Sequence, residues 1–498
     1  MRVTMILPAL TEATGPARRP VKYALFPPLG LATLAGYLDP DDEIDLYDEH
    51  VEPLDLAAML GARPDLVVIQ PYITSARRAY QLADMFRAHG SYVVLGGLHV
   101  TSLPDEAALH ADSIFLGPGE DTWPLFLKEF RDGHPRPRYT STLRTLEALP
   151  PIRRDLIKRH HYLVPNSLVV SRGCPHHCDF CYKDAFFEGG KSFYVQAVDD
   201  ALAEIDRLPG RHLYFLDDHL LGNRRFAEAL FAGMRGMGRV WQAAGTVQSV
   251  LQPGLLERAR DAGLRSLFVG FESVNSPNLP DTRKTQNVGR DYSAVVRRLH
   301  DCGVMVNGSF VFGLDHDGPD VFARTVEWAV GAGVETATFH ILTPYPGTGQ
   351  FRRMEAAGRI RHRDWDLYDT RHVVYDPVGL TPGQLENGYW RAYRDFYTWR
   401  NIGRSAATHA HPRERLRHLA YAGGWKKLEP AWDALIRYGR VLDALPLLER
   451  TLTAFGRHRP NTAADAGTSI PADHERPAAG AVPRSPQGGF AASGAAPD

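Results

Sequence analysis

Short β-branched runs alternate with helical patterns twice along this chain of 498 residues, and this alternation constrains the fold more than any other feature. In residues 1–135 the pattern predicts strands at Val3–Leu7, Glu43–Tyr47, Leu66–Gln70, Tyr92–Leu95 and Ser113–Leu116. Helical patterns accompany them at Gly30–Leu38, Ser75–Ala88 and Thr122–Phe130. Strands that alternate with helices in this way pair in parallel, so we expect an α/β domain with a doubly wound sheet, Rossmann-like or flavodoxin-like.

The alternation resumes in residues 166–351 and predicts a second α/β domain. Its strand candidates are Ser167–Val170, His212–Leu216, Val240–Ala244, Ser266–Phe271, Met305–Phe312 and Thr336–Leu342. Six strand–helix units of this kind predict a partial TIM-like (β/α)6 barrel. Barrel enzymes place their chemistry on the loops that follow the strands.

The remaining segments differ in composition. Residues 136–165 contain Pro137, Pro150 and Pro151 and few periodic apolar residues, so they are predicted to be a linker. Residues 352–458 are rich in aromatic residues at helical spacing, which predicts a helical C-terminal region whose aromatic side chains are mostly packed. Residues 459–498 are dominated by Ala, Pro, Gly and Ser and are predicted to be a disordered tail.

Distinctive loops follow the predicted strands of the first domain. Ligands of open parallel sheets bind at the carboxyl ends of the strands, and glycine lets the backbone approach a ligand closely. Ordinary tight turns account for some of these loops but not for all of them. The candidate ligand contacts in these loops are Tyr72, Thr74, Gly96, Gly97, His99, Gly117, Gly119 and Glu120, and for His99 the alternative is that it only shapes its loop.

Three of the four cysteines lie together, directly after the first predicted strand of the second domain: Cys174, Cys178 and Cys181. Thiolates this closely spaced suit an iron–sulfur cluster or zinc. A structural zinc site closes with four protein ligands, whereas three ligands leave a position open for chemistry. His176 and His177 lie between the cysteines, with little slack to supply a fourth ligand. The spacing therefore favours a reactive metal centre, with structural zinc as the alternative.

The spacing C-x3-C-x2-C, with Phe180 before the last cysteine, resembles the signature of the radical S-adenosylmethionine (SAM) superfamily. This resemblance implies that Cys174, Cys178 and Cys181 bind a 4Fe–4S cluster and leave one iron for SAM. The loops Pro27–Gly30, Gly96–His99 and Gly117–Glu120 are similar to those of the cobalamin-binding domain that precedes the radical core in one large subgroup. Members of that subgroup, the class B radical SAM methyltransferases, often methylate unactivated carbon.

The resemblance also implies contacts to the two organic cofactors. A carboxylate after the second barrel strand, Asp217 or Asp218, could accept the ammonium group of SAM; a helix N-cap is the alternative for either residue. Glu272 and Ser273 follow the fourth strand in a pattern that meets SAM in the family. The implied SAM contacts are Phe180, Asp217, Asp218, Gln248, Glu272, Ser273 and Lys284, and the strand-end residues of the first domain are the implied cobalamin contacts.

One departure from other cobalamin proteins concerns the motif that supplies a histidine to cobalt. Asp48 and His50 match the first half of Asp-x-His-x-x-Gly, but Pro53 stands where the glycine belongs. Either cobalt lacks a protein histidine here, as is usual in this subgroup, or the domain has lost the cofactor.

The activity implied by the resemblance is radical chemistry at a 4Fe–4S cluster that generates a 5′-deoxyadenosyl radical from SAM. We expect cobalamin-dependent methylation of an unactivated carbon in a secondary metabolite or lipid-like precursor. Two alternatives remain open: a cyclase or ring-rearrangement enzyme without methyl transfer, and a metal-stabilised binding module without turnover. The substrate itself is not encoded in any motif.

The composition of the chain bears on its binding partners and on its cellular compartment. The formal net charge is −1, which gives no indication of nucleic-acid binding, and no apolar run reaches transmembrane length. Four cysteines, three of them clustered, are too few for a disulfide scaffold and favour the reducing cytoplasm. The fourth, Cys302, follows a helical pattern and is expected to pack in the core. We expect a small-molecule substrate and an electron donor such as flavodoxin or ferredoxin.

Overall fold

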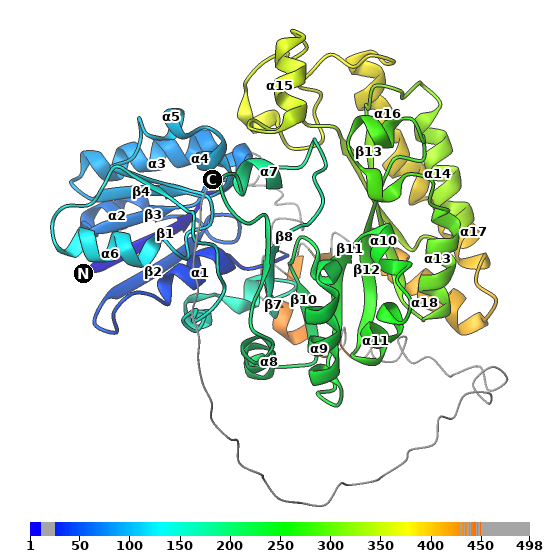
Figure 1. Ribbon diagram of the computed structural model, residues 1–498, viewed down its shortest axis with the longest axis horizontal. Coiled ribbons are helices and arrows are strands. Elements are labelled where there is room, and N and C mark those ends of the chain that lie inside the picture. The colour runs from blue at the N-terminus through cyan, green and yellow to red at the C-terminus, as the bar shows by residue number, and fades with distance from the viewer. Residues whose placement is uncertain are drawn as a thin grey trace, which may run out of the picture. The chain divides into compact units, whose positions relative to one another are not determined.

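The computed structural model describes residues 1–10 and 25–428, together with scattered positions between 431 and 449. The predicted tail at 459–498 lies outside the described residues. The described chain forms two six-stranded parallel sheets and one two-stranded antiparallel sheet (Figure 1).

The first sheet has the strand order β2-β1-β3-β4-β5-β6, and all of its neighbours pair in parallel. This order places β1 inside the sheet, as in the flavodoxin-like doubly wound folds. All five strands expected in residues 1–135 are present. The strands are β1 (Arg2–Leu7), β2 (Glu43–Asp48), β3 (Leu66–Ile69), β4 (Tyr92–Gly96), β5 (Ser113–Leu116) and β6 (Arg138–Thr140).

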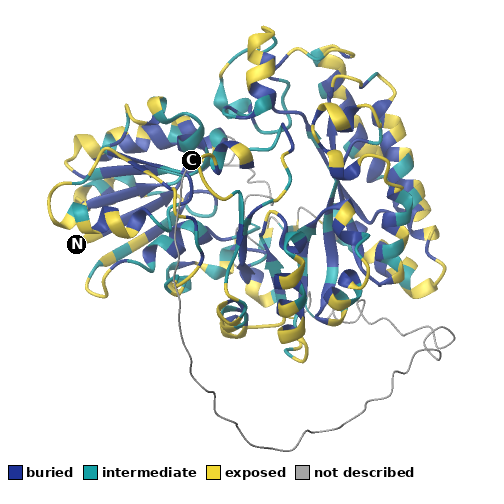
Figure 2. Cartoon of the chain, viewed as in Figure 1, coloured by how far each residue is buried: buried dark blue, intermediate teal, exposed yellow. Residues whose placement is uncertain are grey.

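Helices cover both faces of this sheet, because alternate strand residues point to opposite sides. Val3 and Met5 pack with α1 (Leu29–Ala35) and α6 (Trp123–Arg131), whereas Ile6 belongs to a separate core on the other face. The helices of that second face are α2 (Leu56–Ala62), α3 (Ala76–Ala88), α4 (Leu98–Ser102) and α5 (Pro104–Ala107). Figure 2 shows the buried strands between these helices. The doubly wound prediction is confirmed.

The strand β6 was not expected, because it lies in the stretch predicted as a linker. Its three residues are too few to give a periodic pattern. Tyr139 in β6 is buried and stacks on Phe115 of β5, with ring centroids 5.0 Å apart. The limits 1–135, 136–165, 166–351 and 352–458 remain our proposal for the division of the chain, with β6 just beyond the first of them.

The second sheet has the order β14-β13-β12-β11-β10-β7, with every neighbouring pair parallel, as expected for a partial barrel. Cys302 is buried in the core of this domain, as predicted. The strands are β7 (Ser167–Leu168), β10 (His212–Phe215), β11 (Val240–Gly245), β12 (Leu264–Glu272), β13 (Met305–Phe312) and β14 (Thr336–Ile341). The helices are α7 (Lys183–Phe186), α8 (Val198–Arg207), α9 (Arg224–Met234), α10 (Val247–Val250), α11 (Leu255–Asp261), α12 (Asn278–Asp281), α13 (Tyr292–Asp301) and α14 (Val321–Ala332).

Short 3-10 helices lie at η3 (Ile73–Ser75), η4 (Arg154–Leu156), η5 (Arg159–His161), η6 (Leu220–Gly222), η7 (Thr285–Asn287) and η8 (Trp365–Leu367).

The first barrel strand is shorter than the predicted Ser167–Val170. After β7 the chain leaves the barrel sheet and forms β8 (Ser171–Gly173), which pairs antiparallel with β9 (Phe193–Val195). Gly173 makes this possible, because its φ is +76° and a Cβ there would lie 2.0 Å from the carbonyl oxygen of Ser192. The small hairpin ties together the two ends of the loop that carries the cysteines.

The described part of the C-terminal region is helical, as predicted. The helices are α15 (Gly349–Ala356), α16 (Pro382–Phe396), α17 (Trp399–Ala407) and α18 (Pro412–Lys427). On α16 and just after it, Tyr393 and Tyr397 turn their hydroxyl groups to β14, the edge strand of the barrel sheet. The backbone N–H of Ala337 donates to Tyr397 Oη at 3.0 Å, and that of Phe339 donates to Tyr393 Oη at 3.1 Å. These hydroxyls provide hydrogen-bond partners for backbone groups at the edge of the sheet that would otherwise have none.

None of the helices in the described residues combines the length and the apolar character that a membrane crossing requires.

Candidate active site

The three cysteines lie in the loop at the carboxyl end of β7. Cys178 is buried, and Cys174 and Cys181 are half-buried. The loop is fixed by its backbone: the N–H of Cys174 donates to Ser192 O at 3.1 Å, and that of Cys181 to Cys178 O at 3.0 Å. Gln286 Nε2 contacts Cys178 Sγ at 3.4 Å. The predicted ligands are therefore held on one short loop with an amide against one sulfur.

The electrostatics of this loop couple the three thiols. Burial, with the neighbouring sulfurs adding to it, raises the pKa of Cys181 to about 12. Burial also raises the pKa of Cys174, against an opposing effect of the Lys183 and Lys284 ammonium groups. Thiols that sense one another's charge in a buried, cation-flanked loop suit a metal centre that deprotonates them on binding.

The spread of the sulfurs bears on the kind of metal centre. Among the described residues, a group of three possible metal ligands has all its ligand atoms within 4.8 Å of one another: His300, Glu335 and His409. The three cysteine sulfurs do not form such a group in the described residues. Cysteines that each bind a different iron of one cluster lie farther apart than the ligands of a single ion. The arrangement therefore fits a three-cysteine cluster better than one zinc ion.

Glu272 and Lys284, two of the predicted SAM contacts, form a buried ion pair. Lys284 Nζ lies 2.6 Å from Glu272 Oε1. The β12–β13 register shifts between Gly270 and Glu272, and Glu272 has a φ of +63°, a left-handed conformation that is rare for residues other than glycine. Burial lowers the pKa of Lys284, but the adjacent carboxylate and the Cys178 thiol more than offset this and raise it overall. A strained carboxylate at a strand end, paired with a lysine that senses the cysteines, is typical of a functional position.

Ser273 and Gln248 lie at the carboxyl ends of β12 and β11 but differ in exposure. Ser273 is buried and its hydroxyl accepts a hydrogen bond from Asn278 Nδ2 at 3.1 Å, whereas Gln248 is exposed on α10. Phe180, between Cys178 and Cys181, packs against the barrel core. The role of each in SAM binding remains a prediction.

Asp217 and Asp218 both face the cysteine loop, but in different ways. Asp217 is buried, and its carboxylate accepts hydrogen bonds from the backbone N–H groups of Val170 and Ser171. Asp218 is exposed and accepts from Gly173 N at 3.0 Å and from Tyr182 Oη at 2.5 Å. Asp217 thus holds the strand that leads to the cysteines, and Asp218 is the more accessible carboxylate beside them.

Several buried polar atoms near the cysteines have no hydrogen-bond partner, and two of them belong to residues that sequence reasoning missed, His219 and Gln286. His219 Nδ1 is one; its ring stacks on His176 with centroids 5.8 Å apart, and burial lowers its pKa to about 3. Gln286 Oε1 is the other. Unpaired buried groups are costly unless a ligand meets them, so they fit polar cofactor atoms beside the cysteines. The sequence signal for His219 was its place in the loop that follows β10, which does not separate it from an ordinary loop residue.

A cavity of about 840 Å³ lies next to the cysteine loop, and Arg172 and Tyr182 of that loop contribute to its wall. Three of the predicted cobalamin contacts, Tyr72, Thr74 and His99, line it. The other five lie at the same strand ends without lining it: Gly96, Gly97, Gly117, Gly119 and Glu120.

Glu120 has a partner in the second domain. Arg172 Nη2, on β8, donates to Glu120 Oε1 at 2.5 Å, and both side chains are mostly buried. This ion pair joins a strand-end loop of the first sheet to the strand that enters the cysteine loop. Gly97 and Gly117, in the neighbouring loops, have φ values of +114° and +79°, which residues other than glycine rarely adopt.

His99 fits a polar group in the cavity. Its Nε2 lies 2.8 Å from Tyr80 Oη and 3.3 Å from Glu106 Oε1, whereas its buried Nδ1 has no partner. His50 also lines the cavity, and its Nδ1 lies 2.8 Å from Asp48 Oδ1. The residues present thus provide a roomy cavity with glycine-rich loops nearby and an unpaired polar atom in its wall, which fits a large cofactor such as a corrinoid.

Comparisons with known proteins agree with both halves of this site. The family model of the radical SAM superfamily matches residues 168–347, and that of the B12 binding domain matches residues 22–127. The chain is 31% identical over 346 residues to bacteriochlorophyllide d C-12(1)-methyltransferase of Chlorobaculum tepidum, covering 67% of this chain and 75% of that protein. It is 26% identical to the anaerobic magnesium-protoporphyrin IX monomethyl ester cyclase of Cereibacter sphaeroides, covering 75% of this chain and 68% of that one.

A solved structure shares the fold. It is the radical SAM methyltransferase TsrM of Kitasatospora setae with cobalamin and a [4Fe–4S] cluster bound, and it superimposes with a TM-score of 0.62 at 12% identity over 89% of this chain and 99% of that chain. The predicted fold class and the predicted cofactors, a 4Fe–4S cluster, SAM and cobalamin, are confirmed at the level of the family. The chain belongs to the cobalamin-dependent radical SAM methyltransferase family.

Proposed function

We propose that this protein methylates an unactivated carbon of a large, mostly apolar small molecule, a secondary metabolite or lipid-like precursor. The observation that carries the proposal is the cavity of about 840 Å³, whose wall joins the first domain to the cysteine loop. Leucines, prolines and aromatic residues make up about half of this wall, and polar side chains stand between them, including the charged groups of Arg172, Asp200, Glu204, Arg207 and Asp369. The relative from Chlorobaculum tepidum acts, by its name, on a bacteriochlorophyllide, which supports a substrate of this size and character.

The chain's own residues divide the work in this proposal. Cys174, Cys178 and Cys181 hold the cluster; Glu272, Lys284 and Asp218 meet SAM; Tyr72, Thr74 and His99 meet the corrinoid. When bound, these groups supply a 5′-deoxyadenosyl radical and a transferable methyl group. The protein contributes position and exclusion of water.

In this proposal the substrate is oriented by the part of the cavity wall that comes from the end of the barrel domain and from the C-terminal region. Tyr345 and Pro346 follow β14, and Tyr368, Asp369 and Thr370 come from the C-terminal region. Tyr368 is fully buried and donates a hydrogen bond to the backbone oxygen of His362 at 2.8 Å. A fixed aromatic wall of this kind holds an apolar substrate in one orientation and keeps water away from the radical.

The proposal can be tested with anaerobically purified, reconstituted protein and SAM that carries a CD3 group. The substrate probes are a bacteriochlorophyllide and a hopanoid, since another relative, from Rhodopseudomonas palustris, is by name a hopanoid C-2 methylase. We expect one probe to gain a single CD3 group in place of hydrogen, together with S-adenosylhomocysteine and 5′-deoxyadenosine. The matched control is the Cys178→Ala variant, which should yield none of the three products.

A cyclase is the second candidate, because one relative is a cyclase by name. It predicts 5′-deoxyadenosine and a substrate that loses hydrogen without gaining CD3. That product pattern would show that the protein is a cyclase and not a methyltransferase. If a probe bound in the cavity but no 5′-deoxyadenosine formed in fully reconstituted protein, both enzymatic proposals would fail.

We also infer that a small electron-transfer protein, a flavodoxin or ferredoxin, reduces the enzyme in the cytoplasm. Apart from the three clustered cysteines the chain has only Cys302, which is buried in the barrel core, so it has no second cysteine set for another cluster. Reduced thiols also suit that compartment. Formation of 5′-deoxyadenosine should depend on an added flavodoxin or ferredoxin system when dithionite is left out.

A further inference from the structure

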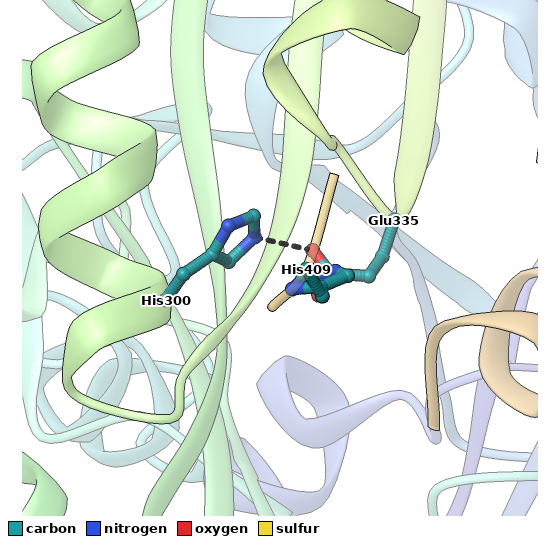
Figure 3. A group of neighbouring side chains, drawn as sticks. All are labelled: His300, Glu335 and His409. Atoms are coloured by element: carbon teal, nitrogen blue, oxygen red, sulfur yellow. Dashed lines mark hydrogen bonds and ion pairs between the residues drawn. The ribbon is translucent and has the colours of Figure 1, made fainter. Parts of the chain in front are cut away.

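A second polar cluster lies at the other end of the barrel strands, away from the cysteines. Glu335 directly precedes β14, and His300 is near the end of α13. His409 follows α17, in the turn that leads to α18. Figure 3 shows the three side chains pointing toward one another from these separate elements. Segments distant in sequence therefore converge where barrel enzymes are normally structural rather than catalytic.

The distances within this cluster are those between ligands of one ion. His300 Nε2 lies 3.2 Å from Glu335 Oε2, and His409 Nε2 lies 3.7 Å from Glu335 Oε1. All three ligand atoms lie within 4.8 Å of one another. Zinc–nitrogen and zinc–oxygen bonds of about 2.0–2.2 Å at tetrahedral angles place neighbouring ligands roughly 3.3 Å apart.

The surroundings close the site. The relative exposure is 0% for Glu335 and 4% for His409. His418 on α18 is 1% exposed, and its Nδ1 lies 3.1 Å from His409 Nε2. His418 therefore borders the cluster through His409, although it is not one of the three residues whose ligand atoms all lie within 4.8 Å of one another. Imidazole nitrogens and a carboxylate in a closed site form the ligand set that zinc prefers in structural roles.

Hydrogen bonds alone do not satisfy this cluster. Glu335 Oε2 accepts from the backbone N–H of Val306 at 2.9 Å and lies beside His300, but Glu335 Oε1 has no hydrogen-bond partner. His409 Nε2 faces both that oxygen and His418 Nδ1, and one nitrogen carries at most one proton. A fully buried carboxylate oxygen without a donor requires an explanation, and a bound cation is one of them.

We propose that His300, Glu335 and His409 bind one Zn²⁺ ion as a structural site, with His418 beside them. The ion would fasten the C-terminal helices α17 and α18 to the start of β14 and the end of α13. Other contacts prepare the same junction: Ser405 Oγ donates to Val334 O at 3.1 Å, and Arg415 Nε donates to His409 O at 2.8 Å.

The rival interpretation is a metal-free ion-pair cluster. Arg417, on α18, is close enough to Glu335 to interact with its charge, and it donates to the backbone oxygen of Gly303 at 3.2 Å. In that interpretation the guanidinium and the histidines balance the carboxylate without zinc. The two interpretations differ in one measurable quantity, the zinc content of the chain.

The test uses the full-length, cluster-reconstituted protein, with zinc and iron counted separately by elemental analysis. We expect about one zinc per chain, at least tenfold less in Glu335→Gln and His409→Ala, and no change in His411→Ala. His411 is the matched control, because it is exposed and lies two residues beyond His409, at the N-cap of α18. The iron content should be equal in all four proteins.

X-ray absorption at the zinc edge shows which side chains hold the ion. We expect a first shell of nitrogen and oxygen at about 2.0–2.2 Å and no sulfur at about 2.3 Å. Removing zinc with a chelator should lower the thermal midpoint of the parent, zinc but not magnesium should restore it, and His409→Ala should not respond. Parent protein without zinc, variants that retain it, or a sulfur shell would each overturn the proposal, and the first two would favour the ion-pair cluster.

Discussion

Charged side chains are buried at both ends of the barrel strands, but the two ends differ in what surrounds these side chains. At the carboxyl ends, the Glu272–Lys284 pair and the unpaired His219 Nδ1 lie beside the cysteine loop, which contributes Arg172 and Tyr182 to the wall of the cavity of about 840 Å³. At the amino ends, His300, Glu335 and His409 converge on one point and line no part of that cavity. The first arrangement suits ligands that enter and leave, whereas the second suits a permanent ion or a closed network.

Backbone geometry explains part of this difference. At the carboxyl end, the irregularity between Gly270 and Glu272 turns a carboxylate out of the strand at a φ of +63°. At the amino end, Gly333 ends α14 in the left-handed conformation, and only Val334 and Glu335 separate it from β14. The amino-end connection is therefore too short to open, while the loops at the carboxyl end have room to hold cofactors.

The sharpest test of the comparison removes a predicted cluster ligand. Replacing Cys174, Cys178 or Cys181 by Ala should abolish reductive cleavage of SAM, because in our proposal all three thiolates are needed to hold the cluster. The measurement is 5′-deoxyadenosine formation together with iron content. Zinc bound at the histidine cluster should not change, since those ligands lie at the opposite strand ends. Cleavage activity in a triple Ala variant with full iron would refute the cysteine assignment.

The architecture was predictable from the sequence because the strands of parallel sheets are continuous apolar runs with helical patterns between them. Where a strand was too short, prediction failed: β6 has three residues, and β7 ends at Leu168. The second failure has a cause in tertiary structure. The carboxylate of Asp217 takes the N–H groups of Val170 and Ser171, and the chain then leaves the barrel sheet for the β8–β9 hairpin.

Site residues that belong to a sequence motif were predictable. Site residues that are recognised only by their contacts in the folded protein were not. The cysteine spacing pointed to one loop, and the structure places Glu272 and Lys284 together near it. The motif did not reveal that the Glu272 carboxylate already has a donor within the chain, the Lys284 ammonium group at 2.6 Å. His219 and Gln286 could not be separated from ordinary core residues before their unpaired atoms were located.

Asp217 tests whether every carboxylate at the carboxyl end serves a ligand. Burial raises its pKa from 3.8 to about 7, so the folded protein keeps a proton that the unfolded chain has lost. Stability should therefore fall as the pH rises from about 4 to 7 and stay level above that. At 1.36 kcal/mol per pKa unit, this carboxyl should cost about 3 kcal/mol between pH 5 and pH 8.

Asp217→Asn should remove that dependence, and the measurement is the difference in unfolding free energy between parent and variant across this pH range. Because other groups titrate equally in both proteins, the difference isolates Asp217. Equal slopes in the two proteins would show that Asp217 is ionised in the fold, and would return it to the candidates for the SAM ammonium group.

Glu272 tests the opposite case, a carboxylate that we assign to a ligand although it already has a partner. Glu272→Ala should weaken SAM binding by about 1.5–3 kcal/mol, or about ten- to a hundredfold, because a charge-assisted hydrogen bond is lost. Glu272→Gln, which keeps an acceptor for Lys284, should cost less. SAM affinity is compared in cluster-reconstituted variants with matched iron. If both variants bind SAM like the parent, Glu272 serves only to pair Lys284.

The smallest effect is expected at the amino end, where a variant should change stability alone. Tyr397 Oη accepts from the N–H of Ala337 at 3.0 Å and donates to its C=O at 2.9 Å, on the second residue of β14. Tyr397→Phe leaves both backbone groups without this partner, so we expect a loss of about 1 kcal/mol, or a thermal midpoint lower by about 3 °C. Tyr393→Phe is the matched control, because its ring is only half-buried and water can replace the hydroxyl. SAM affinity should be unchanged in both variants. A loss of SAM binding in Tyr397→Phe without loss of stability would show that the edge of β14 is coupled to the cofactor end, and the separation between the two ends of the barrel would fail.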